Sequence, residues 1–200
     1  MKLLKLGITG GIGSGKSTAS NFFKEKNAYI FNADRESKKH LKSSLSLQKR
    51  IINIFGNKIT QNNKIHFPYL AEVAFENKTN QEILNGIMWP EILLIISNTF
   101  KEIKEENKYK LFIVDAALIF EANYQSFFDY TLLITANKKI RTERAIKRRN
   151  ISLENIQNRM ALQMSDKEKT KIADYIIKNN YSMKKFTMEL EEFYSNILFK

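Results

Sequence analysis

The sequence predicts an α/β protein built on a five-stranded parallel sheet. Five short apolar runs are spread along its 200 residues, and they are continuous rather than alternating, as in strands buried on both faces. Charged, helix-like segments separate these runs, as expected for strand–helix–strand crossovers. The predicted strands are Leu3–Thr9, Ala28–Phe31, Leu111–Ala116, Tyr130–Thr135 and Tyr175–Lys178.

The first predicted strand leads into a glycine-rich loop. Residues 10–17 match the phosphate-loop pattern G-x-x-x-x-G-K-[ST] in full, with a strand before the loop and a helix after it. Backbone amides of such a loop curl around phosphate oxygens, and the helix N-terminus adds a favourable field. Lys16 is expected to reach the β- and γ-phosphates, and the Ser17 hydroxyl to bind Mg²⁺. The predicted ATP contacts here are Gly11, Ile12, Gly13, Ser14, Gly15, Lys16, Ser17 and Thr18.

A dinucleotide-binding turn is the alternative interpretation of the same loop. Its glycine spacing is similar, and that motif expects an acid at the end of the second strand to hold a ribose, where Asp34 stands. The Gly15-Lys16-Ser17 sequence favours the triphosphate interpretation, because a dinucleotide site has no use for the lysine. Taken alone, Asp34 is also explained as the N-cap of a helix starting at Arg35.

The third predicted strand ends in an acid. Asp115 follows four apolar residues and stands where nucleoside triphosphatases carry a magnesium-binding carboxylate. A strand-end acid can instead cap a turn. Beside a phosphate loop, we interpret Asp115 as a ligand of Mg²⁺ through water.

Two long intervals interrupt the sheet pattern and predict insertions. The sequence divides into a nucleotide-binding core (1–34, 109–136 and 171–200), a helical insertion (35–108) and a second insertion (137–170). Insertions at strand ends are where α/β enzymes bind ligands. In the second one, Arg141, Arg144 and Arg148 share one helix face. Alone, such a face is typical of a solvated helix; beside a phosphate loop it suits a lid over ATP.

The last predicted helix covers the sheet. Its apolar residues recur at helical spacing, and Ser182 is a plausible N-cap. This stripe predicts packing rather than a ligand site. Its members are Met183, Phe186, Leu190, Phe193 and Ile197.

Composition excludes several classes of site. There is no Cys and there are two His, which excludes disulfides and thiolate zinc sites and disfavours a transition-metal centre. No apolar stretch approaches the roughly 18 residues of a membrane span, so we expect a cytoplasmic protein without a membrane partner. The net charge of +12 is compatible with nucleic acid binding, but acids interrupt the basic residues and a general compositional bias explains it as well.

Over nearly its whole length the chain resembles the dephospho-coenzyme A kinase family. The resemblance is carried by ITGGIGSGKST at 8–18, the Ala-Asp pair at 33–34, LIFE at 118–121, Arg144-x-x-x-Arg148, Gln163, and ADYIIKNN at 173–180. It implies a three-layer P-loop kinase fold. The implied reaction is transfer of the ATP γ-phosphate to the ribose 3′-hydroxyl of dephospho-CoA. With Mg²⁺ as the expected cofactor, we further expect a monomeric or weakly associating protein that does not bind nucleic acid.

The resemblance also implies roles for individual residues. Asp34 would orient and deprotonate the acceptor hydroxyl, and Arg144 and Arg148 would belong to the lid. Asp174 and Asn179 would lie near the adenine end of the ATP site. Residues 35–108 would carry much of the acceptor domain. Acceptor contacts would involve Trp89, Pro90, Leu118 and Glu121.

The chain departs from the family pattern at several positions. Asn32 stands where an Asp is common, Trp89 where a His precedes the proline, and Phe67 where an Arg is common. Ala117 replaces a usual Pro and Arg141 a usual Gln. These departures keep open a related kinase for another nucleotide or hydroxylated acceptor. The net charge keeps open a nucleic-acid-binding ATPase or a non-catalytic binding module.

Overall fold

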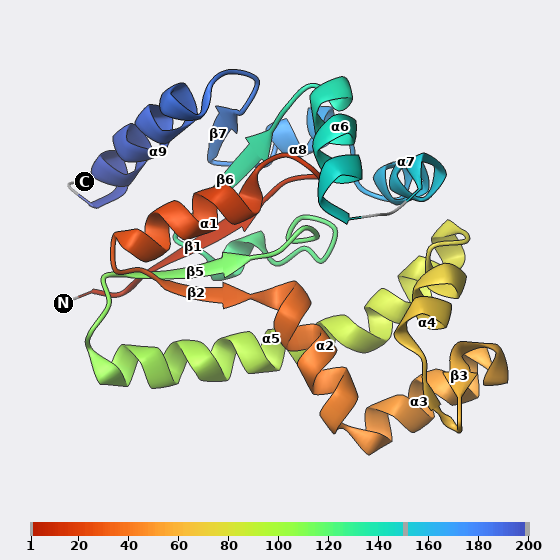
Figure 1. Cartoon of the computed structure of the whole chain (residues 1–200). Helices are drawn as coiled ribbons and strands as arrows, with labels where there is room; N and C mark the ends of the chain where they lie inside the picture. The colour runs from red at the N-terminus through yellow and green to blue at the C-terminus, as the bar shows by residue number, and fades with distance from the viewer. Residues whose placement is uncertain (1, 150–151, 199–200) are drawn as a thin grey trace. The chain divides into compact units, whose positions relative to one another are not determined.

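The computed structural model describes residues 2–149 and 152–198 and divides them into two compact units. The first unit comprises residues 1–32 and 99–200, and the second comprises residues 33–98. A five-stranded sheet forms the centre of the first unit (Figure 1). The second unit is mainly helical.

All five strands of the sheet are parallel and follow the order β2-β5-β1-β6-β7. This confirms the predicted fold class and each predicted strand to within one residue at either end. Parallel pairing places the ends of β1, β2 and β5 together, with Asp115 opposite both Ile8 and Asn32. The strands are β1 (Leu4–Thr9), β2 (Tyr29–Asn32), β5 (Leu111–Asp115), β6 (Tyr130–Thr135) and β7 (Tyr175–Lys178).

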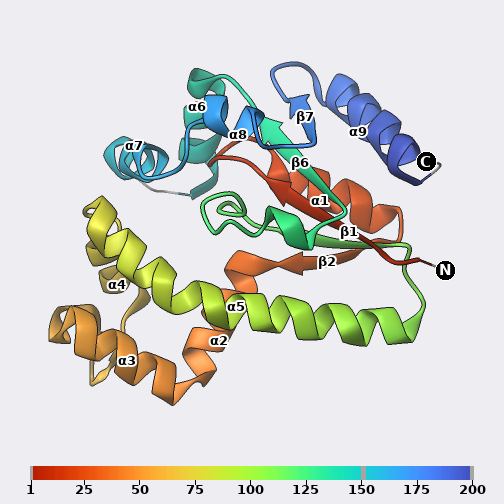
Figure 2. The ribbon, with the colours of Figure 1, turned by 180° about the vertical axis from the view of Figure 1, so that it is seen from behind.

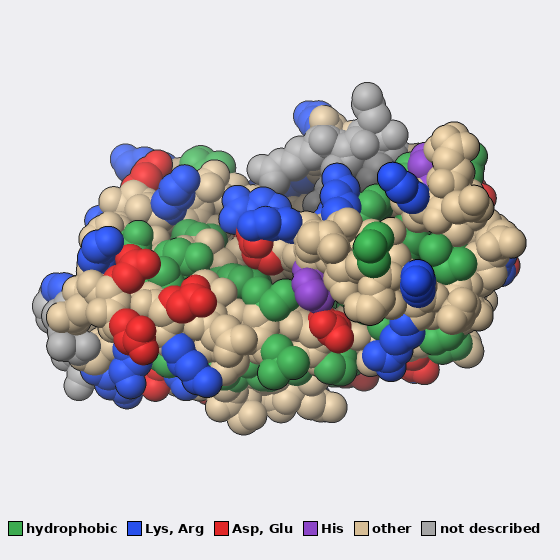
Figure 3. All heavy atoms as spheres, turned by 90° about the horizontal axis from the view of Figure 1, so that it is seen from below, with side chains coloured by type: hydrophobic (Ala, Val, Ile, Leu, Met, Phe, Trp, Pro, Cys, Tyr) green, Lys and Arg blue, Asp and Glu red, His purple; other side chains and the backbone are tan. Residues whose placement is uncertain are grey.

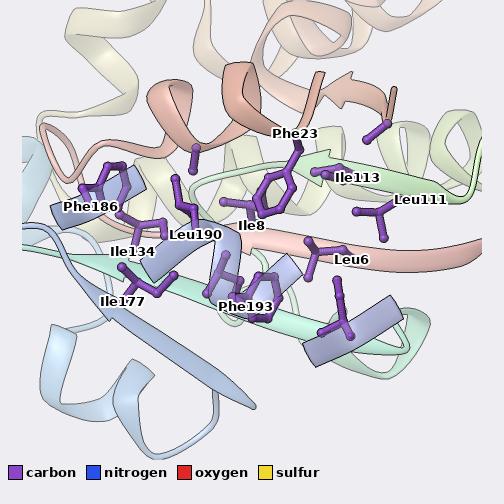
Figure 4. Close-up of a cluster of buried hydrophobic side chains, with 14 residues drawn as sticks. Leu6, Ile8, Phe23, Leu111, Ile113, Ile134, Ile177, Phe186, Leu190 and Phe193 are labelled. Carbon is purple, nitrogen blue, oxygen red and sulfur yellow. The ribbon is translucent and has the colours of Figure 1, made fainter. Parts of the chain in front are cut away.

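Two helices bury one face of the sheet. α1 (Lys16–Glu25) passes in front of β1 in Figure 1 and behind it in Figure 2, and α9 (Met183–Leu198) packs beside it. Phe23 from α1 and Phe186 from α9 meet aliphatic side chains of the strands (Figure 4). Four of the five predicted stripe residues of α9 are buried, whereas Met183 is 61% exposed because it lies at the first residue of the helix.

The other face of the sheet is covered by aromatic side chains. Phe100, near the end of α5 (Lys78–Glu106), makes edge contacts with Phe112 of β5 and with Phe127. Phe127 and Phe128 lie in the loop after β5. Phe128 is so near Gly7 that a β-carbon on Gly7 would be 2.9 Å from the Phe128 ring. Burial raises the pKa of Tyr124 in the same loop to about 12.

Three further helices connect β6 to β7 in the first unit. They are α6 (Lys138–Arg149), α7 (Leu153–Ala161) and α8 (Asp166–Thr170). Ser152 caps α7, and α8 begins with a reciprocal capping box between Ser165 and Glu168. The Ser165 hydroxyl and amide both donate to the Glu168 carboxylate, which lowers its pKa.

The second unit has its own hydrophobic core. Ile51 and Ile59 are fully buried there, together with Leu41, Leu70 and Ile87. Its elements are α2 (Ala33–Ser43), α3 (Leu45–Phe55), a 3-10 turn (Asn57–Ile59), β3 (Thr60–Gln61), β4 (Lys64–Ile65), α4 (Phe67–Ala74) and the first part of α5.

The β3–β4 hairpin differs from the sequence expectation of helices alone in this interval. Asn62 and Asn63 form its turn with φ values of 52° and 59°. Asn tolerates this left-handed conformation, and a primed turn with two such residues joins antiparallel strands well. The strands are only two residues long, too short for an apolar periodicity to reveal them.

α5 is continuous over 29 residues and includes Pro90. Among the described residues it is the one helix long and apolar enough, by length and composition, to cross a membrane. A single helix of this kind is weak evidence for a membrane span, although only 17% of its apolar window is buried inside the protein. On the surface in Figure 3, Lys and Arg side chains are dispersed among acidic ones rather than gathered in one block.

Candidate functional site

The glycine-rich loop follows β1 directly and ends where α1 begins at Lys16. Gly10 has φ 151° and Gly13 has φ 75°, a region that favours glycine. A β-carbon on Gly10 would overlap the Ile134 carbonyl, so the loop lies tightly against the end of β6. The Lys16 ammonium donates to the Gly10 carbonyl at 2.8 Å. Ser17 is exposed in the first turn of α1.

Asp115 lies at the same edge of the sheet as the loop. Its side chain is buried, with 5% of the residue exposed, and Oδ2 accepts a hydrogen bond from the Ser20 hydroxyl at 2.9 Å. Ser20 lies one helical turn after Lys16. Parallel strands bring their carboxyl ends together, which is why a strand-end acid 95 residues away in sequence can meet Ser20 in the helix that follows the loop.

Magnesium suits the oxygen atoms of this edge. Mg²⁺ prefers hard oxygen ligands and uses few protein groups, taking the rest from water and substrate phosphates. The Ser17 hydroxyl and the Asp115 carboxylate are such groups. Among the described residues no cluster of three or more His, Cys, Asp or Glu gathers to hold an ion.

The arginines of the second insertion have protein partners. Arg141 is 8% exposed; its Nε donates to the Ile12 carbonyl at 3.0 Å and its Nη1 to Asp166 at 2.7 Å. Arg144 Nη1 donates to the Asn179 carbonyl at 3.0 Å. The side chain of Arg148 lies outside the described part of the chain, although its backbone belongs to α6.

Asn179 and Asp174 lie at opposite ends of β7. The Asn179 amide nitrogen Nδ2 donates to the Ser14 carbonyl at 2.9 Å, and its backbone amide donates to Thr135 at 2.7 Å, so Asn179 lies against the phosphate loop. Asp174 instead accepts from the backbone and hydroxyl of Thr131 at the start of β6. Because the loop is at the carboxyl ends of the strands, Asp174 is at the opposite edge of the sheet. This corrects the expected contact between Asp174 and the nucleotide, because the Asp174 side chain instead links the start of β6 to the start of β7.

Glu121 forms a buried ion pair that the sequence did not suggest. Its Oε1 lies 2.9 Å from Lys169 Nζ and also accepts from the Met164 amide at 2.9 Å. The Lys169 side chain is 1% exposed and also donates to the Ala117 carbonyl at 3.0 Å. Lys169 is one of several lysines in a charged segment, so nothing in the local pattern marks it. Leu118, in the same loop as Glu121, is half-buried.

The remaining predicted residues belong to the second unit. α2 begins at Ala33, so Asp34 lies inside its first turn, and the expected N-cap of a helix starting at Arg35 is wrong. The Asp34 side chain is exposed. Trp89 is half-buried and Pro90 exposed, both within α5.

Comparisons with known proteins agree over nearly the whole chain. The family model described as "Dephospho-CoA kinase" matches residues 4–185. A dephospho-CoA kinase of Fusobacterium nucleatum is 36% identical over 198 residues, covering 98% of this chain and 100% of that protein. One of Chlamydia caviae is 34% identical over 194 residues, covering 97% and 96%. The solved structure of dephospho-CoA kinase from Campylobacter jejuni is 29% identical, with a TM-score of 0.67 and 96% of each chain covered.

Proposed function

This chain belongs to the dephospho-CoA kinase family, and on that premise we propose which of its side chains carry out the ATP-dependent phosphorylation of dephospho-CoA. The γ-phosphate of ATP is transferred to the ribose 3′-hydroxyl of dephospho-CoA to give coenzyme A. The observation that carries the proposal is the complete phosphate loop, with Lys16 and Ser17, at the sheet edge where β5 ends in Asp115.

The nucleotide is held by backbone and cation together. The amides of the loop and of Ser17 and Thr18 bind the phosphates, and the Lys16 ammonium leaves the Gly10 carbonyl to bind the β- and γ-phosphates. Ser17 and, through water, Asp115 would hold Mg²⁺, which would supply positive charge to neutralise the transferring phosphoryl group.

Asp34 is the proposed base for the acceptor hydroxyl. It follows Asn32, the last residue of β2, by two positions, and that strand ends beside β5. Its exposure leaves the carboxylate accessible to a ligand. A carboxylate within hydrogen-bond reach can orient the hydroxyl and take its proton as the bond to phosphorus forms. The Asn32 amide can orient a hydroxyl but cannot take its proton.

The segment 137–170 is the proposed lid. Arg144 and Arg148 are the residues that we assign to the phosphoryl group, since a guanidinium binds phosphate in a bidentate manner. Closure would exclude water and so favour transfer over hydrolysis. Two contacts support this assignment: Arg144 donates to the Asn179 carbonyl, and Asn179 itself donates to Ser14 of the phosphate loop.

Arg144→Ala is expected to lower kcat by about 10²–10³-fold, because removal of a donor aimed at transition-state charge typically has that effect. The measurement is steady-state kinetics at saturating ATP. Lys139→Ala is the matched control, since it removes an exposed cation from the same helix. If the kcat of Arg144→Ala equalled that of the control, Arg144 would not bind the transferring phosphoryl group.

The acceptor is proposed to contact the second unit and the loop after β5. Trp89 and Pro90 would contribute from α5, and Leu118 and Glu121 from the loop. Glu121 would act through Oε2 or through its backbone, because Oε1 already binds Lys169 and the Met164 amide whereas Oε2 has no hydrogen-bond partner among the described residues. We further propose a cytoplasmic monomer that binds neither nucleic acid nor membrane.

The substrate is tested directly by measuring ADP release from Mg-ATP against a panel of dephospho-CoA, AMP, shikimate and nucleosides. Dephospho-CoA is expected to stimulate ADP release most strongly. Phe67 and Trp89, which depart from the family pattern, motivate the rest of the panel. If another acceptor stimulated ADP release and dephospho-CoA did not, that other acceptor would be the substrate.

A further inference from the structure

We propose that Arg141 is a positioning residue that aims the phosphate loop at ATP, rather than a lid arginine that reaches the γ-phosphate. The proposal rests on the assignment of residues 10–17 to ATP binding. It concerns a side chain that shares its helix face with Arg144 but has different partners.

The Arg141 guanidinium spans two partners on the outer side of the loop. Nε donates to the Ile12 carbonyl at 3.0 Å, and Nη1 donates to Asp166 at 2.7 Å. Asp166 also accepts from the Thr135 hydroxyl at 2.7 Å, so its carboxylate is held at the end of β6 and the start of α8. Only 10% of the Arg141 side chain is exposed. It is thus fixed and neutralised before any nucleotide arrives.

The loop glycines fit closely around this side chain. A β-carbon on Gly11 would overlap the guanidinium, and one on Gly13 would overlap the backbone carbonyl of Arg141. The start of α6 therefore packs directly against the loop backbone. An arginine in this position cannot swing toward a phosphate without breaking the ion pair and opening this packed surface.

Peptide geometry explains what the contact does. In a trans peptide, the carbonyl of one residue and the amide of the next lie in one plane and point in opposite directions. When Arg141 holds the Ile12 carbonyl outward, the Gly13 amide must point to the other side, into the loop. A preoriented amide binds an anion without a further loss of conformational entropy.

Two other side chains act on alternate residues of the same loop. Asn179 Nδ2 donates to the Ser14 carbonyl, which directs the Gly15 amide inward, and Lys16 donates to the Gly10 carbonyl. The carbonyls of residues 10, 12 and 14 are thus each held by a side chain. Arg141 holds the carbonyl of Ile12, and Asp166 links the Arg141 side chain to β6 and α8.

The test is nucleotide binding without acceptor, measured by calorimetry with ADP and Mg²⁺. For Arg141→Met, which removes every donor but keeps the length of the side chain, we expect a tenfold to hundredfold higher Kd, because a hydrogen bond from a charged group contributes about 1.5–3 kcal/mol. kcat at saturating ATP should stay within about threefold of the unmodified protein. Arg141→Lys should not restore binding, since one ammonium cannot match the two directions of the guanidinium.

Asp166→Asn and Lys139→Gln complete the experiment. Asp166→Asn keeps Arg141 but removes the negative charge that holds it, so the Kd for ADP should rise by a smaller factor, even if Arg141→Met fails to fold. Lys139→Gln, an exposed charge on the same helix, should leave Kd unchanged. A fall in kcat of tenfold or more with unchanged Kd would make Arg141 a ligand of the transferring group and overturn the proposal. Unchanged Kd and kcat in both variants would overturn it as well. Failure of the unmodified protein to bind ADP would instead refute the assignment of the loop.

Discussion

Replacement of Asp34 by Asn is expected to lower kcat by about 10²–10⁴-fold while leaving the Kd for ATP within about twofold. The amide keeps the size of the side chain and can still orient a hydroxyl, but it cannot accept the proton. Because the ATP phosphates are bound by the loop, Lys16 and Mg²⁺, removal of the acceptor's base should not weaken nucleotide binding. Single-turnover phosphoryl transfer and ATP calorimetry measure the two effects separately.

Glu36→Gln is the matched control for this experiment. Glu36 is the other acid in the first turn of α2, so its replacement changes the charge at the same helix end. It pairs with Arg35 and Lys39 on the surface, and such exposed pairs contribute little to stability. The control should retain nearly full kcat. If Asp34→Asn abolished ATP binding instead, Asp34 would belong to the nucleotide or metal site.

The sequence predicted the sheet well because burial on both faces leaves a continuous apolar run. Residues 130–135 and 175–178 form strands with the predicted ends, and the buried stripe of α9 follows its helical period. The phosphate loop was equally visible, since its glycines and Lys16 serve one chemistry at fixed spacing. These features are local, so the residues that specify them stand together in sequence.

Features that depend on distant partners were not predictable in the same way. The three arginines lie in one helix, α6, as their spacing predicted. The spacing does not reveal that Arg141 binds Asp166 or that Arg144 binds the Asn179 carbonyl. Asp174 and Asn179 stand five residues apart in one motif. They nevertheless face opposite edges of the sheet, because a strand runs between them.

Lys169→Ala is expected to lower the free energy of unfolding by about 3–5 kcal/mol. The reason is that Glu121, whose side chain is 14% exposed, would lose its cation while remaining inside the protein. Urea denaturation measures the effect, with Lys167→Ala, an exposed lysine of the same short helix, as the control. A loss no larger than that of the control would mean that water enters and solvates the Glu121 carboxylate.

A double substitution separates the ion pair from simple packing. In Glu121→Gln/Lys169→Met no charge remains buried, so we expect the double variant to be more stable than Lys169→Met alone, with a coupling energy of about 1–3 kcal/mol. The Gln side chain can still accept from the Met164 amide, which keeps the segment between α7 and α8 attached to the loop after β5. Additive losses would contradict a direct charge interaction. Because Met164 lies within the proposed lid, between α7 and α8, recovery of stability should be accompanied by recovery of kcat if this attachment holds the lid in place.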